Sequence, residues 1–156
     1  MNKFVKIAAA AAFAIIPVEA LAVTANVTFG ATVTHSCAIT VNSNGTLAAN
    51  AGFTQLSSTI GAGTSGSANI VATGNEFDVS VGAPTLTTTG SDTSANTLVS
   101  SYSTTGATSV SGTNADAARG LNNGTTAVTV NMSATKSGAN VFEAGAYTGT
   151  VALTCE

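Results

Sequence analysis

The residues from Ala22 to Thr34 alternate between apolar side chains and small or polar ones, and this alternation constrains the fold more than any other feature. The apolar positions are Val23, Ala25, Val27, Phe29, Ala31 and Val33. A period of two is typical of a β-strand that buries one face. The same alternation returns at Cys37, Ile39 and Val41, so it covers about twenty residues, whereas one strand usually has three to ten. We therefore expect an N-terminal extension, residues 23–35, that leads into a first body strand.

The rest of the chain, residues 36–156, is expected to be all-β. No amphipathic helical pattern is present there, and Gly, Asn, Ser and Asp separate short runs of strand-forming residues. The strand candidates are Cys37–Val41, Phe53–Leu56, Ala68–Thr73, Phe77–Val81, Thr97–Ser103, Thr126–Ala134 and Tyr147–Cys155. Seven short strands of this kind predict an antiparallel β-sandwich of immunoglobulin-like type. The stretch from Leu86 to Asp116 is rich in Ser, Thr and Gly with weak periodicity, and we expect it to contain a long surface connection.

Residues 1–22 have the pattern of a secretory signal peptide. Two lysines near the start precede an apolar run from Ile7 to Val18, which leads into the small-x-small sequence Ala20-Leu21-Ala22. Cleavage after Leu21 or after Ala22 fits this pattern, and we favour Ala22. The pattern predicts export, and no later stretch is long and apolar enough to suggest membrane insertion after cleavage.

The charge of the chain argues against several classes of partner. After signal cleavage, the only cations are Arg119 and Lys136, and they do not form a basic cluster. Nucleic acid and anionic lipid are therefore not expected as partners. So weak a surface charge also suits a protein that packs against copies of itself.

The two cysteines, Cys37 and Cys155, lie on the first and last strand candidates. In an exported chain, the default expectation is one disulfide between them. Such a bond would close nearly the whole domain, and the chain-entropy model values it at about 4–5 kcal/mol. Two free thiols, or a bridge between molecules, are the alternatives.

No group of residues points to catalysis, a metal or a cofactor. His35 is the only histidine, so it lacks both metal-binding companions and a catalytic triad. Glu76 and Asp78 lie two apart on the outward face of a predicted strand, where a solvated face is the simpler interpretation. Neither a Gly-x-Ser-x-Gly motif nor a phosphate-binding loop is present. We expect a protein that is not an enzyme.

The last strand candidate, Tyr147–Cys155, is apolar on alternate residues and is followed only by Glu156. A long apolar strand at the edge of a sheet promotes aggregation unless another strand pairs with it. The alternating extension at the other end of the chain could provide that strand for a neighbouring molecule. Repeated head to tail, such a contact does not close on itself and produces a filament.

Three segments resemble a known family. The segment AVTANVTFGATVTHSCAITV resembles the mature N-terminus of spore-coat-U-like pilins, the subunits of archaic chaperone–usher pili. The segment EAGAYTGTVALT is similar to the Gly-x-Tyr-x-x-Thr ending of that family, and ANIVATGNEFDVSVG to its second and third strands.

The resemblance implies an incomplete immunoglobulin-like sandwich that is completed by donor-strand exchange. Its implied partners are a periplasmic chaperone, an outer-membrane usher and other copies of the chain in a homopolymer, exported through the periplasm to the cell surface as a fibre for attachment or biofilm. The implied donor residues are Val23, Ala25, Val27, Phe29 and Ala31. The implied acceptor groove has Ile39 and Val41 on one wall and Val151 and Leu153 on the other.

The chain departs from the family at one point, and two other functions stay open. In the family, the first-strand cysteine usually bonds to one on the next strands, where this chain has Ala72 and Thr73; here Cys155 is the only available partner. The alternative functions are a monomeric secreted binding module that uses its own first strand, and a coat or matrix protein that does not polymerise.

Overall fold

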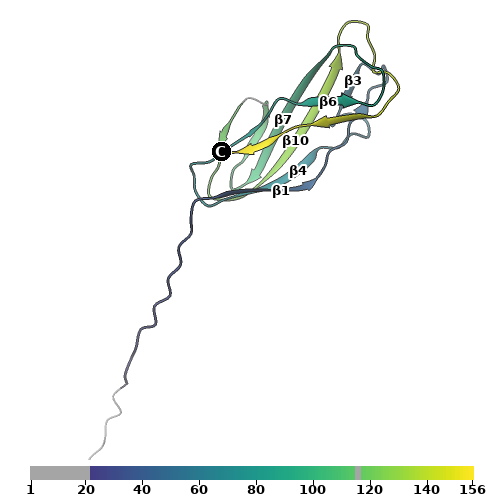
Figure 1. The fold of residues 1–156 in the computed structure, drawn as a ribbon. Helices are drawn as coiled ribbons and strands as arrows, with labels where there is room; N and C mark the ends of the chain where they lie inside the picture. The colour runs from purple at the N-terminus through teal and green to yellow at the C-terminus, as the bar shows by residue number, and fades with distance from the viewer. Residues whose placement is uncertain (1–21, 115–116) are drawn as a thin grey trace, which may run out of the picture. The chain divides into compact units, whose positions relative to one another are not determined.

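The computed structural model describes residues 22–114 and 117–156, and within these ranges every regular element is a β-strand. Twelve strands are present (Figure 1): β1 Cys37–Ser43, β2 Ala48–Ala49, β3 Gln55–Ser57, β4 Gly66–Ala72, β5 Asp78–Val81, β6 Thr85–Thr88, β7 Asn96–Gly106, β8 Val110–Asn114, β9 Arg119–Gly120, β10 Gly124–Lys136, β11 Tyr147–Thr150 and β12 Leu153–Cys155.

The chain divides into two units, Met1–Ala31 and Thr32–Glu156. In the described part of the first unit, residues 22–31, no strand is formed and the side chains are exposed, Phe29 to 90%. The predicted signal peptide lies outside the described residues except for Ala22. No helix among the described residues is long and apolar enough to cross a membrane.

One layer of the second unit is a seven-stranded sheet built around β10. On one side, β10 pairs with β4 along residues 124–130 and with β3 along residues 133–135; on the other side, it pairs with β7. β1 pairs with β4 and stands at the end of this sheet. The long strand β10 therefore organises the layer, while β1 is one of its edges.

The second layer consists of two small sheets, β12-β5-β9 and β11-β6. Every pairing in both layers is antiparallel. Buried residues of both layers form one cluster, which includes Ile70 and Val128 from the large sheet and Val79 and Val81 from the small one. The predicted all-β antiparallel sandwich is confirmed.

Alternation explains which residues form the core. Along β10, the even-numbered residues from Thr126 to Lys136 are buried or, at Val130, partly buried against the same core, while Ala127 and Thr129 are exposed. Tyr102 of β7 is 1% exposed, and its hydroxyl hydrogen bonds to the carbonyl oxygens of Val79 (3.1 Å) and Ala117 (2.6 Å). These hydrogen bonds satisfy the only polar group of a large core side chain, and the bond to Val79 links the two layers.

Two predictions about the elements are wrong. The stretch Leu86–Asp116 holds most of β6 and all of β8 in addition to β7, which covers the predicted strand Thr97–Ser103, so it is not a long surface connection. Threonine is β-branched and favours strands. Backbone pairing and a few buried positions can therefore hold a strand together in this stretch without a regular apolar pattern. The last strand is split into β11 and β12, since its two halves pair with different strands, β6 and β5.

Candidate functional site: an apolar groove between the first and last strands

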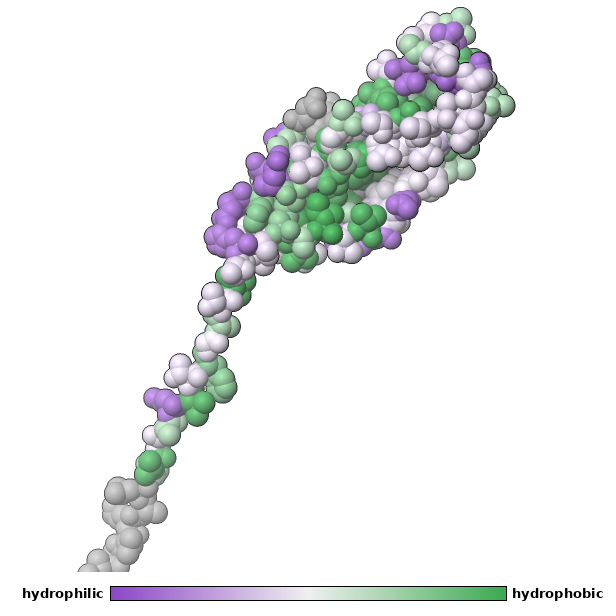
Figure 2. Space-filling view, in the orientation of Figure 1, coloured by the Kyte–Doolittle hydropathy of each residue, from purple (hydrophilic) through white to green (hydrophobic). Residues whose placement is uncertain are grey.

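A groove of about 670 Å³ lies between β1 on one side and β11 and β12 on the other, and it belongs entirely to the second unit. Figure 2 shows apolar residues on this face of the sandwich. The apolar side chains that line the groove are Val41, Leu47, Ala68, Val130, Met132, Tyr147, Val151 and Leu153. The residues come from both layers, so the groove is a gap in the sandwich that reaches core side chains.

The strands that border the groove are both sheet edges. β1 ends the seven-stranded sheet, and β12 ends the three-stranded one. In the part of the chain that the structure describes, neither is paired on the side that faces the groove. A strand edge of this kind presents free backbone N–H and C=O groups.

The backbone of β1 directs these groups into the groove at alternate residues. The N–H of Thr73 donates to the carbonyl oxygen of Ser36 at 2.9 Å, so Ser36 faces β4. In an antiparallel ladder, successive residues point their backbone groups to opposite sides. Cys37, Ile39 and Val41 therefore turn their N–H and C=O groups away from β4, toward the groove.

The last strand has the same arrangement on the opposite side. Asp78 and Glu156 exchange two backbone hydrogen bonds, and the N–H of Gly82 donates to the carbonyl of Ala152 at 2.8 Å. The N–H of Thr89 donates to the carbonyl of Ala146 at 3.1 Å. The even-numbered residues thus face β5 and β6. The odd-numbered residues that face the groove are Tyr147, Gly149, Val151 and Leu153.

Three of the four residues predicted for the groove line it. Val41, Val151 and Leu153 are lining residues, whereas Ile39 is not and is 37% exposed. Sequence reasoning missed Leu47 and Met132, which belong to other segments of the chain and carry no sequence signal that associates them with the last strand. Tyr147 and Gly149 could have been found, because they continue the alternation of Val151 and Leu153.

Gly149 has a close neighbour on the groove floor. A Cβ at this position would meet the Met132 sulfur, with Leu47 Cδ1 at 3.4 Å. The Met132 side chain therefore occupies the space beside the glycine backbone. Both contacting groups are the flexible ends of side chains, so this part of the floor can adjust.

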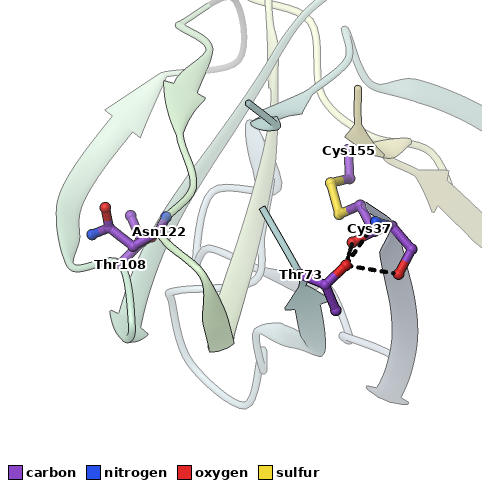
Figure 3. Close-up of a disulfide and its surroundings, with 6 residues drawn as sticks. Cys37, Thr73, Thr108, Asn122 and Cys155 are labelled. Carbon is purple, nitrogen blue, oxygen red and sulfur yellow. Dashed lines mark hydrogen bonds between the residues drawn. A yellow bond between two sulfur atoms is a disulfide. The ribbon is translucent and has the colours of Figure 1, made fainter. Parts of the chain in front are cut away.

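A disulfide joins the two walls at one end of the groove. Cys37 of β1 and Cys155 of β12 are bonded, with their Cα atoms 6.4 Å apart (Figure 3). The predicted disulfide is confirmed. Cys37 lies opposite Ala72 in the β1–β4 ladder, so its disulfide runs to the other layer and not to the neighbouring strand.

The same end holds the chain segment that leads into β1. The Thr73 hydroxyl accepts a hydrogen bond from the Ser36 N–H at 2.8 Å and donates to the Thr34 carbonyl at 2.7 Å. Beside it, His35 forms an ion pair with Glu76, and both side chains are largely exposed. These contacts tie residues 34–36 to the sandwich next to the disulfide.

At the other end, Tyr147 is held by a buried ion pair. The Lys136 ammonium donates to Asp92 Oδ1 at 2.8 Å, and both side chains are 1% exposed. Asp92 Oδ2 accepts a hydrogen bond from the Tyr147 hydroxyl at 2.8 Å. The hydrogen bond from Lys136, followed by one from Ser94, holds the pKa of Asp92 well below its usual range. Burial, and then the hydrogen bond to Asp92, raise the pKa of Tyr147.

The residues predicted to be donors lie in residues 22–31, where no strand is assigned. The larger ones are strongly exposed, including Val23 at 91%. Ala25 and Ala31 are exposed as well. Among the described residues, this alternating apolar segment pairs with no strand.

No family model matches the sequence, and no curated protein matches it.

Proposed function

We propose that this chain is the structural subunit of a surface fibre, in which the extension of one copy fills the groove of the next. The observation that carries the proposal is a pair of free strand edges that face each other across an apolar groove, in a chain that also has an exposed alternating segment. A single inserted strand would satisfy both edges and cover the groove.

The energetics favour such an insertion. Burying a side chain of Val or Phe size contributes about 1.5–3 kcal/mol, and backbone hydrogen bonds form along both walls. An apolar groove between unpaired strands also promotes aggregation when left open. A protein with this groove therefore needs either a chaperone or another subunit to cover it.

The class of fibre follows from the resemblance stated above. We assign the chain to the spore-coat-U-like pilins, with a periplasmic chaperone that fills the groove first and an outer-membrane usher at which the next subunit replaces it. Because the donor segment and the groove are different parts of the chain, the contact is heterologous and builds an open filament.

A single substitution tests the donor role. Phe29→Asp introduces a charge at a position that inserts into the groove, so fibres should be lost while chaperone-bound monomer remains. Thr28→Asp places the same charge on the opposite face of the extension and is the matched control; it should have much less effect.

The measurement is a detergent gel of protein sheared from the cells that export it, with one sample unheated and one heated. Wild type and Thr28→Asp should show a ladder that collapses to one band on heating. A ladder of unchanged length from Phe29→Asp would refute the donor assignment. A lone monomer band from folded wild-type protein would refute the fibre and favour the binding-module alternative.

A further inference from the structure

We propose that the inserted strand has one register, in which Phe29 of one copy lies opposite Gly149 of the next. This inference rests on the proposed fibre function and adds to it the direction and the side-chain pairing of the strand. It is argued from the closed end of the groove, from the positions that face it and from the sizes of the side chains.

The disulfide end of the groove is closed. The lining residues stop at Val41 on one wall and at Leu153 on the other, short of the Cys37–Cys155 bond that joins the walls. The chain's own residues 34–36 are tied down beside that bond. An incoming strand remains attached to its own sandwich by its C-terminal end. It must therefore leave through the other end, beside Leu47 and Tyr147, so it runs antiparallel to β11 and β12.

Only three registers cover all the groove-facing positions of the last strand. Among the residues of this strand that line the groove, the odd-numbered ones, which point away from β5 and β6, are Tyr147, Gly149, Val151 and Leu153. The extension has six apolar positions at the same spacing, from Val23 to Val33. Since side chains alternate between faces, a register can shift only by two residues. Leu153 can thus lie opposite Val23, Ala25 or Val27.

Side-chain size distinguishes these registers. With Ala25 opposite Leu153, a small residue meets a large one in three of the four pairs, as close packing favours, and the fourth joins two valines. The four pairs are Ala25 with Leu153, Val27 with Val151, Phe29 with Gly149, and Ala31 with Tyr147. With Val23 opposite Leu153, Phe29 would lie opposite Tyr147. With Val27 opposite Leu153, Phe29 would lie opposite Val151 and Ala31 opposite Gly149.

The floor beneath Gly149 also suits an aromatic ring. An aromatic side chain that lies across from a glycine covers its exposed backbone. The Met132 sulfur lies directly beside Gly149, and thioether sulfurs make favourable contacts with aromatic rings. Met132 and Leu47 contact this position through flexible ends, so they can move to admit the ring.

Pairs of introduced cysteines test the register in assembled fibres. Val27→Cys with Val151→Cys reports the proposed register. Ala25→Cys with Val151→Cys and Val27→Cys with Leu153→Cys report the two shifted registers. Directly opposed residues in an antiparallel pair have Cα atoms about 5.5 Å apart, within the range for a disulfide, whereas a shift of two residues takes them beyond about 7 Å. None of these variants alters Phe29 or Gly149.

Fibres of each variant are sheared, free thiols are blocked, and the samples are run without reductant before and after heating. All three should form an unheated ladder, and the 27/151 pair should keep at least about tenfold more covalent ladder after heating than either other pair. Wild type, with its cysteines bonded to each other, should keep none.

The other outcomes separate the two proposals. A heat-stable ladder from either shifted pair overturns the register and leaves strand insertion intact. An unheated ladder in all samples with no covalent ladder in any overturns the register and the groove as the insertion site. Monomers alone in every unheated sample, wild type included, overturn the fibre itself.

Discussion

At the scale of single residues, the sandwich contains a buried ion pair between Lys136 and Asp92, and its stability depends on both charges staying paired. Lys136 is one of only two lysine or arginine residues after residue 22, yet its ammonium is buried and lies 4.7 Å from the centroid of the Phe142 ring. A buried charge is tolerated only when it is paired and hydrogen-bonded. Asp92 provides the pair and also binds the Tyr147 hydroxyl, so the open end of the groove depends on it.

Asp92→Asn should lower the melting temperature at neutral pH by about 5 °C or more, because it leaves the Lys136 ammonium buried without an anion. The folded-state pKa of Asp92 is below its ordinary value of 3.8. The stability from the ionised carboxylate is therefore present above that value and is lost as pH falls below it. Thermal melts between pH 7 and pH 2 measure both effects.

The pH dependence of these melts provides the control. Below about pH 4, wild type should lose stability more steeply than Asp92→Asn, which cannot gain a proton at this position. The double variant Asp92→Asn with Lys136→Met removes both charges and should recover part of the loss. Parallel pH profiles for wild type and Asp92→Asn would contradict the role assigned to this carboxylate.

At the scale of strands, the groove depends on how the last strand is built. Its even residues pair with β5 and β6, and its odd residues point their side chains and backbone groups toward the groove. Gly149 is the one groove-facing position of this strand without a side chain. Its missing Cβ is therefore a feature of the groove surface, and filling it should affect insertion more than folding.

Gly149→Val should leave the sandwich folded and abolish the fibre ladder. The atoms nearest to a Cβ added here belong to the flexible ends of Met132 and Leu47. Valine also has a higher strand propensity than glycine. Thr129→Val is the control, because Thr129 is exposed on β10 and is not among the residues that line the groove. Melting temperature reports folding, and the unheated detergent gel reports assembly. A full ladder from Gly149→Val would contradict the groove assignment.

At the scale of the whole molecule, the Cys37–Cys155 bond links the two layers of the sandwich. It joins β1, an edge of the large sheet, to β12, an edge of the second layer, across 118 residues of chain. The backbone pairings of these strands run within each layer and not between them. The disulfide is therefore the covalent tie between the two walls of the groove.

Replacing both cysteines with alanine should lower the free energy of unfolding by about 4–5 kcal/mol, the value that the chain-entropy model gives for a loop of this length. Denaturant unfolding of wild type and of the double variant measures the difference. Reductant should destabilise wild type and leave the double variant unchanged. A difference below about 1 kcal/mol would mean that the bond contributes little to closing the chain.

The sequence by itself determined the features that depend on local periodicity. Alternation of period two predicted an all-β chain, the alternating extension and most of the strands, and the two cysteines of a chain expected to be exported predicted their bond. It also identified Val41, Val151 and Leu153, because each lies on an alternating strand at one end of the domain.

Only the tertiary structure decided which strands meet, because pairing joins residues that are far apart in the chain. It brought Leu47 and Met132 to the groove beside Gly149 and left Ile39 outside it. It added β6 and β8 on either side of the predicted strand in the threonine-rich stretch, and it divided the last strand between two partners. Periodicity reports the face of a strand that is buried, whereas the neighbour along each edge is selected by packing of the whole sandwich.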